Sequence, residues 1–119
     1  MKQKMRELIK VLKAVSDKNR LRIFKMLQHK KMCVCEISAA LGITQPSVSR
    51  HLSLMKDAGL VEDNRDGPWI DYALCEEKIN QYAPVIQSLL KKWINDDPNI
   101  KEILKKIKTI KREKLFSKV

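Results

Sequence analysis

The chain has 119 residues, which suits one domain and is short for two. Its 25 Lys and Arg residues outnumber 14 Asp and Glu residues, and the formal net charge of +11 favours a polyanionic partner such as nucleic acid. No apolar run could span a bilayer, no secretory signal is visible and three cysteines make no disulfide framework, so we expect a cytoplasmic protein with reduced thiols and no membrane partner.

Two amphipathic helices are predicted at the start of the chain. Apolar residues recur at helical spacing from Met5 to Val15. Asp17 then offers an N-cap for a second helix, whose apolar residues run from Leu21 to Leu27. Residues 1–31 carry a net charge of +9, so this end of the chain supplies much of the positive field.

A helix-turn-helix is predicted in the middle of the chain. Its first helix runs from about Cys35 to Leu41 and ends at Gly42, because glycine readily takes the left-handed conformation that a sharp turn requires. Thr44 is a good N-cap for the second helix, and Pro46 is tolerated in the first turn of that helix.

A β-hairpin wing is predicted directly after the second of these helices. Residues 60–63 and 69–74 are strand-like, and residues 64–68 contain the Asn, Asp, Gly and Pro that form turns. Residues 60–75 carry a net charge of −3, and Arg65 is the one cation among them. We therefore expect this wing to make few phosphate contacts, with Arg65 as its candidate.

Helices return in the last third of the chain. Apolar residues at helical spacing predict a helix over residues 77–94 and a last helix from about Pro98 to Ile110. The net charge of residues 76–119 is +5. The predicted fold class is mainly α with a small β-hairpin, namely a winged helix-turn-helix with flanking N- and C-terminal helices.

Four segments resemble the ArsR/SmtB family of bacterial repressors: residues 14–24, Cys33-Val-Cys-Glu-Ile37, residues 41–61 and residues 67–74. The similarity covers roughly residues 5–94, and the Cys-Val-Cys-Glu pattern is typical of the arsenic-responsive branch. The resemblance implies that the segment before Cys35 pairs with the second wing strand. It also implies a homodimer through the outer helices, which binds operator DNA at an inverted repeat with half-sites roughly 34–36 Å apart.

A metalloid site is predicted at Cys33 and Cys35. Arsenite and antimonite are soft, and thiolates hold soft ions best, so these ions are the expected inducers and no cofactor is required. The family often has a third cysteine where this chain has Ser38, so either Cys75 or a small external thiol is the candidate third ligand. We expect the helix N-terminus to lower the pKa of both thiols.

The spacing of the two cysteines predicts how the inducer acts. Residues two apart on a helix point about 200° apart, since each residue turns about 100°. One ion reaches both sulfurs only if the backbone at Cys33–Cys35 is extended or unwound, so we expect binding to distort the first turn of the helix. Binding of the inducer and binding of DNA would then exclude each other.

The exposed polar face of the second helix is predicted to read the major groove. Gln pairs bidentately with adenine and Arg with guanine, and Ser suits phosphates or bases. The candidate DNA-binding residues are Gln45, Ser47, Ser49, Arg50, His51, Ser53 and, on the wing, Arg65. His51 either meets a phosphate or packs against the turn. These residues belong to the first of two predicted parts of the chain. Residues 1–95 form a DNA-binding and sensor domain with dimerisation helices, and residues 96–119 form a basic C-terminal helical extension.

Three alternatives to a metalloid-released repressor remain open at this point. The same cysteines could form a thiol redox or persulfide switch. The cysteines could also be inert in a constitutive DNA-binding protein. A thiol enzyme such as an arsenate reductase would need an anion-binding loop around its cysteine, and Cys33 precedes a helix without any Gly-rich segment, so we expect no enzyme.

Overall fold

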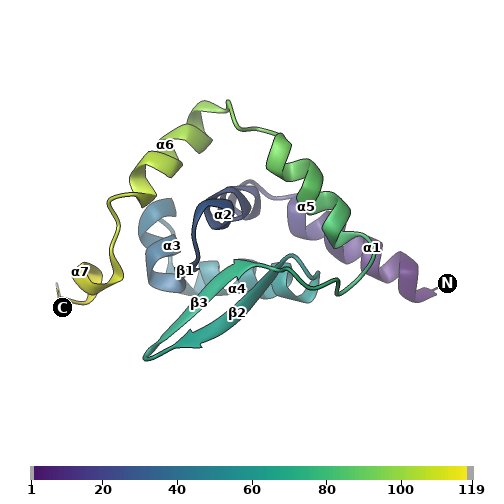
Figure 1. Ribbon diagram of the computed structural model, residues 1–119, viewed down its shortest axis with the longest axis horizontal. Helices are drawn as coiled ribbons and strands as arrows, with labels where there is room; N and C mark the ends of the chain where they lie inside the picture. Colours follow the sequence, from purple (N-terminus) through teal and green to yellow (C-terminus); the bar gives the residue numbers. More distant parts are fainter. Residues whose placement is uncertain (1, 118–119) are drawn as a thin grey trace.

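The computed structural model describes residues 2–117, which form a winged helix-turn-helix with flanking helices, as predicted (Figure 1). The elements in chain order are α1 (Lys2–Val15), α2 (Lys18–His29), β1 (Met32–Cys33), α3 (Val34–Leu41), α4 (Gln45–Asp57), β2 (Val61–Asp66), β3 (Trp69–Leu74), α5 (Ala83–Lys92), α6 (Pro98–Ile107) and α7 (Arg112–Ser117). None of the described helices is long and apolar enough to cross a membrane.

The sheet joins the helix-turn-helix to the wing. Its strand order is β1-β3-β2 and both pairings are antiparallel. Strand β1 is two residues long and places Met32 opposite Tyr72 and Cys33 opposite Asp71. This confirms that the segment before α3 pairs with the second wing strand. Strand β2 extends further than predicted, because its ladder continues until Asp66 faces Trp69.

The helix-turn-helix forms as its sequence predicts. Gly42 ends α3 with φ 69°, in the left-handed region, and the Thr44 side chain accepts a hydrogen bond from the Ser47 N–H at the start of α4. Val48, Leu52 and Met55, on one face of α4, are completely buried. The opposite face of α4 is therefore left for solvent or DNA.

Helix α2 lies at the centre of the molecule, with α5 and α6 arching over it (Figure 1). Its core residue Lys25 is 1% exposed, and its Nζ donates to the carbonyls of Leu90 and Trp93, at 3.0 and 3.1 Å, and to Asn95 Oδ1 at 2.6 Å. Burial lowers the pKa of Lys25 below its ordinary value. These bonds satisfy the carbonyl end of α5 and flank Ile94, which has a φ of 54° that is unfavourable for a β-branched residue.

The C-terminal helices differ from the prediction. Helix α5 begins at Ala83 and not near residue 77, because the side-chain Oδ1 of Asn80 accepts from the N–H groups of Tyr82 and Ala83 and holds the chain there. The single helix expected over residues 98–110 is two helices, α6 and α7. Ile103 and Ile107 on α6 join the core, so the predicted extension begins with a helix that belongs to the globule.

We predict that Lys25→Met destabilises the fold by about 1–3 kcal/mol, because it removes the hydrogen bonds that the Lys25 Nζ donates to the Leu90 and Trp93 carbonyls and to Asn95 Oδ1 at the end of α5. The measurement is urea unfolding of both proteins, followed by helical circular dichroism. Lys101→Met, at an exposed position of α6, is the matched control. Equal midpoints for the two variants would contradict the role given to Lys25.

Candidate functional site

Cys33 and Cys35 form a close pair at the boundary between β1 and α3, which we call the cysteine pair. Their Sγ atoms are 2.8 Å apart, and both residues are free cysteines. Cys33 is the N-cap of α3 and is extended, with φ −89° and ψ 169°, whereas Cys35 lies in the first turn of the helix. Cys33 is buried and Cys35 is half-buried.

Of the two backbone arrangements that would let one ion reach both sulfurs, extended or unwound, the structure has the extended one at Cys33. Helix α3 begins at Val34, so Cys33 belongs to the strand and the helical angle between residues two apart does not apply. Thiolate sulfurs lie about 2.3 Å from a bound ion such as zinc, so an ion beside the pair can contact both sulfurs. The cysteine pair is already arranged as a chelating dithiol.

Glu36 fixes the backbone of the cysteine pair. Its Oε1 accepts a hydrogen bond of 3.0 Å from the Cys33 N–H, and Glu36 is 8% exposed. A Glu at the third helical position that bonds back to the N-cap backbone is half of a capping box. The spacing from Cys33 to Glu36 contained this information, but the sequence analysis treated Glu36 only as part of a family pattern.

The predicted lowering of the pKa is wrong for Cys33. Burial, the hydrogen bond with Cys35 and the nearby Glu36 carboxylate together raise the pKa of Cys33 to about 12, although the Glu36 N–H opposes them. The desolvation of a thiolate next to a carboxylate outweighs the favourable dipole of a short helix. Cys33 is therefore a neutral thiol near pH 7.

Cys75 does not join the pair within one chain. It follows β3, where its N–H donates to the Leu60 carbonyl and its thiol to the Glu77 carbonyl. Because Asp71 faces Cys33, Cys75 is four strand residues away, roughly 13 Å. No group of three His, Cys, Asp or Glu residues among the described part of the chain is arranged to hold a metal ion.

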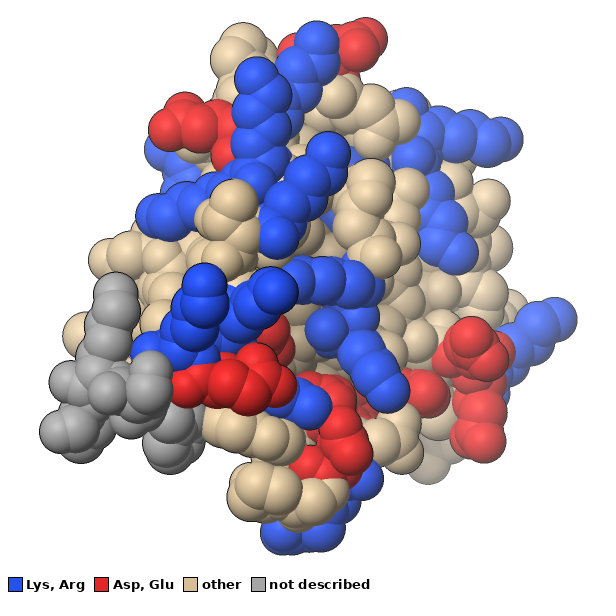
Figure 2. Space-filling view, turned by 60° about the vertical axis from the view of Figure 1, so that its left-hand side comes forward, with Lys and Arg blue, Asp and Glu red and all other residues tan. Residues whose placement is uncertain are grey.

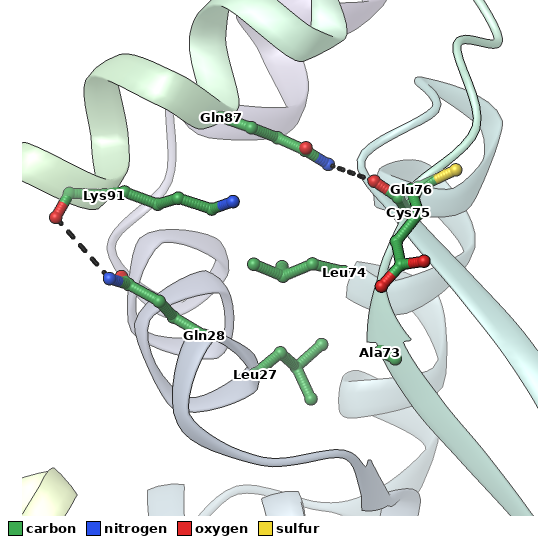
Figure 3. A pocket seen from close by; sticks show the side chains of 8 residues that line it. All are labelled: Leu27, Gln28, Ala73, Leu74, Cys75, Glu76, Gln87 and Lys91. Atoms are coloured by element: carbon green, nitrogen blue, oxygen red, sulfur yellow. Dashed lines mark hydrogen bonds between the residues drawn. The ribbon is translucent and has the colours of Figure 1, made fainter.

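Cys75 instead borders a pocket between α2, the end of β3 and α5, where its sulfur is directed away from Leu74 and Lys91 (Figure 3). Burial raises its pKa, and the Glu62 carboxylate adds to this. Gln87 donates to the Cys75 and Leu60 carbonyls and so closes one end of the pocket. These contacts describe a structural residue more closely than a metal ligand.

The candidate DNA-binding residues occupy one face of α4 and the wing. The exposed ones are Gln45, Ser49, Arg50, Ser53 and Arg65, and Ser47 is half-buried. His51 differs, because its Nδ1 lies 3.1 Å from Arg20 Nη1 and 3.9 Å from Asp17 Oδ2. It holds α4 against the junction of α1 and α2, so the packing alternative describes its observed contacts.

Arg112 is the second residue that the sequence analysis missed. Its guanidinium binds Asp71 at 2.6 Å and Asp66 at 2.8 Å, and it lies over the Trp69 ring at 4.8 Å. These partners are more than 40 residues away in sequence, so no local pattern could have revealed the contacts. Through Arg112, α7 is attached to the wing.

Comparison with known proteins identifies the same family that the sequence motifs resemble. The family model of bacterial regulatory proteins of the arsR family matches residues 17–63. The arsenic resistance transcriptional regulator ArsR1 of Pseudomonas putida is 31% identical over 100 residues, which cover 78% of each chain. The chain belongs to the ArsR family of transcriptional regulators.

Solved structures of transcriptional regulators have the same fold. The transcriptional repressor BigR from Xylella fastidiosa matches with a TM-score of 0.63 and 28% identity over 82% of this chain and 93% of its own. A homodimeric winged helix-turn-helix domain from Mycobacterium bovis matches with a TM-score of 0.61 and 26% identity, over 74% and 82%. Relatives and fold are those of DNA-binding regulators, so the protein is a regulator and not a thiol enzyme.

The raised pKa predicts a slow reaction of Cys33 with alkylating agents. At pH 8 we expect iodoacetamide to modify Cys33 at least about tenfold more slowly in the folded protein than in urea, since the thiolate is the nucleophile. Mass spectrometry of the peptide containing the pair measures each site. The rate should rise as pH increases toward 11, and a fast, pH-independent reaction of folded Cys33 would contradict the assignment.

Proposed function

We propose that this ArsR-family repressor binds operator DNA as a homodimer and releases it when trivalent arsenic or antimony binds Cys33 and Cys35. The observation that supports this proposal most directly is the pair of free cysteine sulfurs, 2.8 Å apart, at the start of the helix-turn-helix. The relative from Pseudomonas putida, named as an arsenic resistance regulator, supports the same inducer. Soft, thiophilic ions are the ones that such a dithiol prefers.

The protonation of the pair favours a metalloid over a divalent cation. When arsenous acid binds, each sulfur replaces one hydroxyl, and the thiol proton leaves with that hydroxyl as water. No net charge is created in the buried site. A divalent cation needs ionised thiols and releases their protons, which the high pKa of Cys33 opposes near pH 7. We therefore expect arsenite to outcompete cadmium and zinc at neutral pH.

The third coordination position stays open to solution in this proposal. Ser38, at the place of the family's third cysteine, already donates its hydroxyl to the Ile43 carbonyl. Cys75 lies too far along β3 to reach the pair of its own chain. A retained hydroxide or a small external thiol then completes the site.

Binding is transmitted at the boundary between β1 and α3, because Cys33 belongs to β1 and Cys35 lies on α3. One ion bound to both sulfurs joins these two elements. This fixes the position of β1, which pairs with the wing strand, relative to α3, which packs on the recognition helix α4.

The dimer is proposed through α1 and α5. Exposed apolar side chains lie on both helices, including Met5, Ile9, Val85 and, at the end of α5, Trp93. The homodimeric structure from Mycobacterium bovis supports this assembly. A two-fold dimer presents two copies of α4 to the two halves of an inverted repeat.

A thiol redox switch is the second candidate, and the same short sulfur distance favours it. Two thiols would form a disulfide and give two protons and two electrons to an oxidant such as a peroxide. The high pKa of Cys33 counts against this route, because the thiolate is the reacting form. Arsenite added with a phosphine reductant, in place of a thiol that would itself bind arsenite, distinguishes the two, since only the metalloid mechanism releases DNA under those conditions.

Cys33→Ser and Cys35→Ser should each keep operator binding and lose arsenite-induced release. Serine is a good N-cap, so Cys33→Ser preserves the start of α3, but its hydroxyl is a poor ligand for a soft ion. The measurement is an operator titration by fluorescence anisotropy with and without arsenite. Cys75→Ser is the control and should respond like the unmodified protein; release of a Cys33→Ser variant at ordinary arsenite concentrations would disprove the site.

Arg50→Ala should weaken operator binding more than binding to random DNA. A bidentate contact to guanine contributes about 1–3 kcal/mol of discrimination, whereas a phosphate contact contributes equally to any sequence. Arg65→Ala on the wing is the comparison, and we expect it to reduce both affinities alike. An equal loss on both DNAs for Arg50→Ala would make Arg50 a phosphate contact.

A further inference from the structure

The wing of this protein has the wrong charge for a DNA-binding element. Residues 60–75 carry four acidic side chains and one Arg, and Asp66 lies next to the turn at the tip. Duplex DNA is a dense line of phosphates, so uncompensated carboxylates near the wing would repel it. A DNA-binding role for this wing needs a source of compensating positive charge.

The compensating charge comes from α7. Arg112 binds Asp66 on β2 and Asp71 on β3, and its guanidinium stacks on Trp69, so all three contacts lie on the hairpin. Trp69 and Asp71 are two residues apart on β3 and therefore share one face of the strand. A planar guanidinium suits this combination of two carboxylates and an aromatic ring, which a lysine would not match.

A third wing carboxylate is compensated from the other side. Lys56, in the last turn of α4, donates to Asp63 on β2 at 3.0 Å. Asp63, Asp66 and Asp71 thus each have a cationic partner, and two of these three depend on the single residue Arg112. Arg112 and Lys56 together reduce the net charge at the wing from −3 to −1 in the folded protein.

Helix α7 also lies where it can extend the DNA-binding surface. It packs against α3 and lies on the same side of the molecule as the tip of the wing (Figure 1). Figure 2 shows many Lys and Arg side chains over the upper and middle parts of this side, with most of the Asp and Glu side chains lower down and a few at its upper edge. Lys108 and Lys111, which precede α7, are exposed.

We propose that α7 is part of the DNA-binding surface, where Arg112 attaches it to the wing, offsets part of the negative charge of Asp66 and Asp71 and lets the wing approach the phosphate backbone. The partner of this composite surface is the backbone of duplex DNA beside the groove that α4 reads. The proposal rests on DNA binding by the winged helix and not on the arsenic site. Arg112 acts here as a positioning residue, because its guanidinium is bound to the wing itself.

The test compares Arg112→Gln with Lys101→Gln, which removes the same charge from an exposed position on α6. We expect Arg112→Gln to lower operator affinity by about tenfold at low salt, and Lys101→Gln to lower it far less. Asp66→Asn in the Arg112→Gln background should recover much of the loss, because it removes the exposed charge. Asp66→Asn alone should give a smaller gain, because Arg112 already pairs with that carboxylate.

If Arg112 acts through its contact with Asp66, the effects of Arg112→Gln and Asp66→Asn on DNA affinity are not additive. If Arg112 contributes only a general positive charge, the two effects add. Equal losses for the two Gln variants, or the same gain from Asp66→Asn in both backgrounds, would overturn the proposal. If Arg50→Ala left operator affinity unchanged, by contrast, the role of α4 would be in question, but the role proposed for the Arg112 contact with the wing would not.

A second measurement reports docking of α7 without DNA. The chain has two tryptophans, so Trp93→Phe leaves Trp69 as the single fluorophore. Arg112→Gln in that background should shift the emission and increase its quenching by acrylamide, while circular dichroism stays unchanged. A changed Trp69 signal with unchanged DNA affinity would mean that the contact is structural only and would also overturn the proposal.

Discussion

The pairing of β1 with β3 is the constraint on which the proposed site depends. This pairing involves only two residues of β1, yet it holds the backbone of Cys33 extended. The Cys33 sulfur therefore lies beside the Cys35 sulfur and is not turned away from it, as it would be on a continuous helix. The same ladder places Asp71 opposite Cys33, and Asp71 receives Arg112 from α7. The cysteine pair, the wing and α7 therefore meet at one pair of residues.

Local patterns in the sequence were enough to predict the helix-turn-helix. The buried face of α4 follows helical periodicity, Gly42 supplies a positive φ and Thr44 caps the next helix, and each of these depends on near neighbours only. The start of α5 could not be predicted in this way. Asn80 competes with the helix by bonding the backbone two and three residues ahead, although the apolar pattern continues through Ile79.

The chemistry of the candidate site was less predictable than its residues. The sequence identified both cysteines, but their geometry depends on a two-residue strand whose partner is about 40 residues away. The direction of the Cys33 pKa shift depends on burial and on Glu36, and a helix-terminus argument alone gave the opposite sign. The contacts of Arg112 arise from tertiary packing of a segment that the family resemblance did not cover.

The buried Lys25 has a consequence for the geometry of the assembly. It ties the end of α5, and the strained backbone at Ile94, to the central helix α2. In a dimer built on α1 and α5, the direction of α5 sets the distance between the two copies of α4. Lys25, a core residue that does not contact DNA bases, would therefore help to determine the length of the spacer that the protein accepts between operator half-sites.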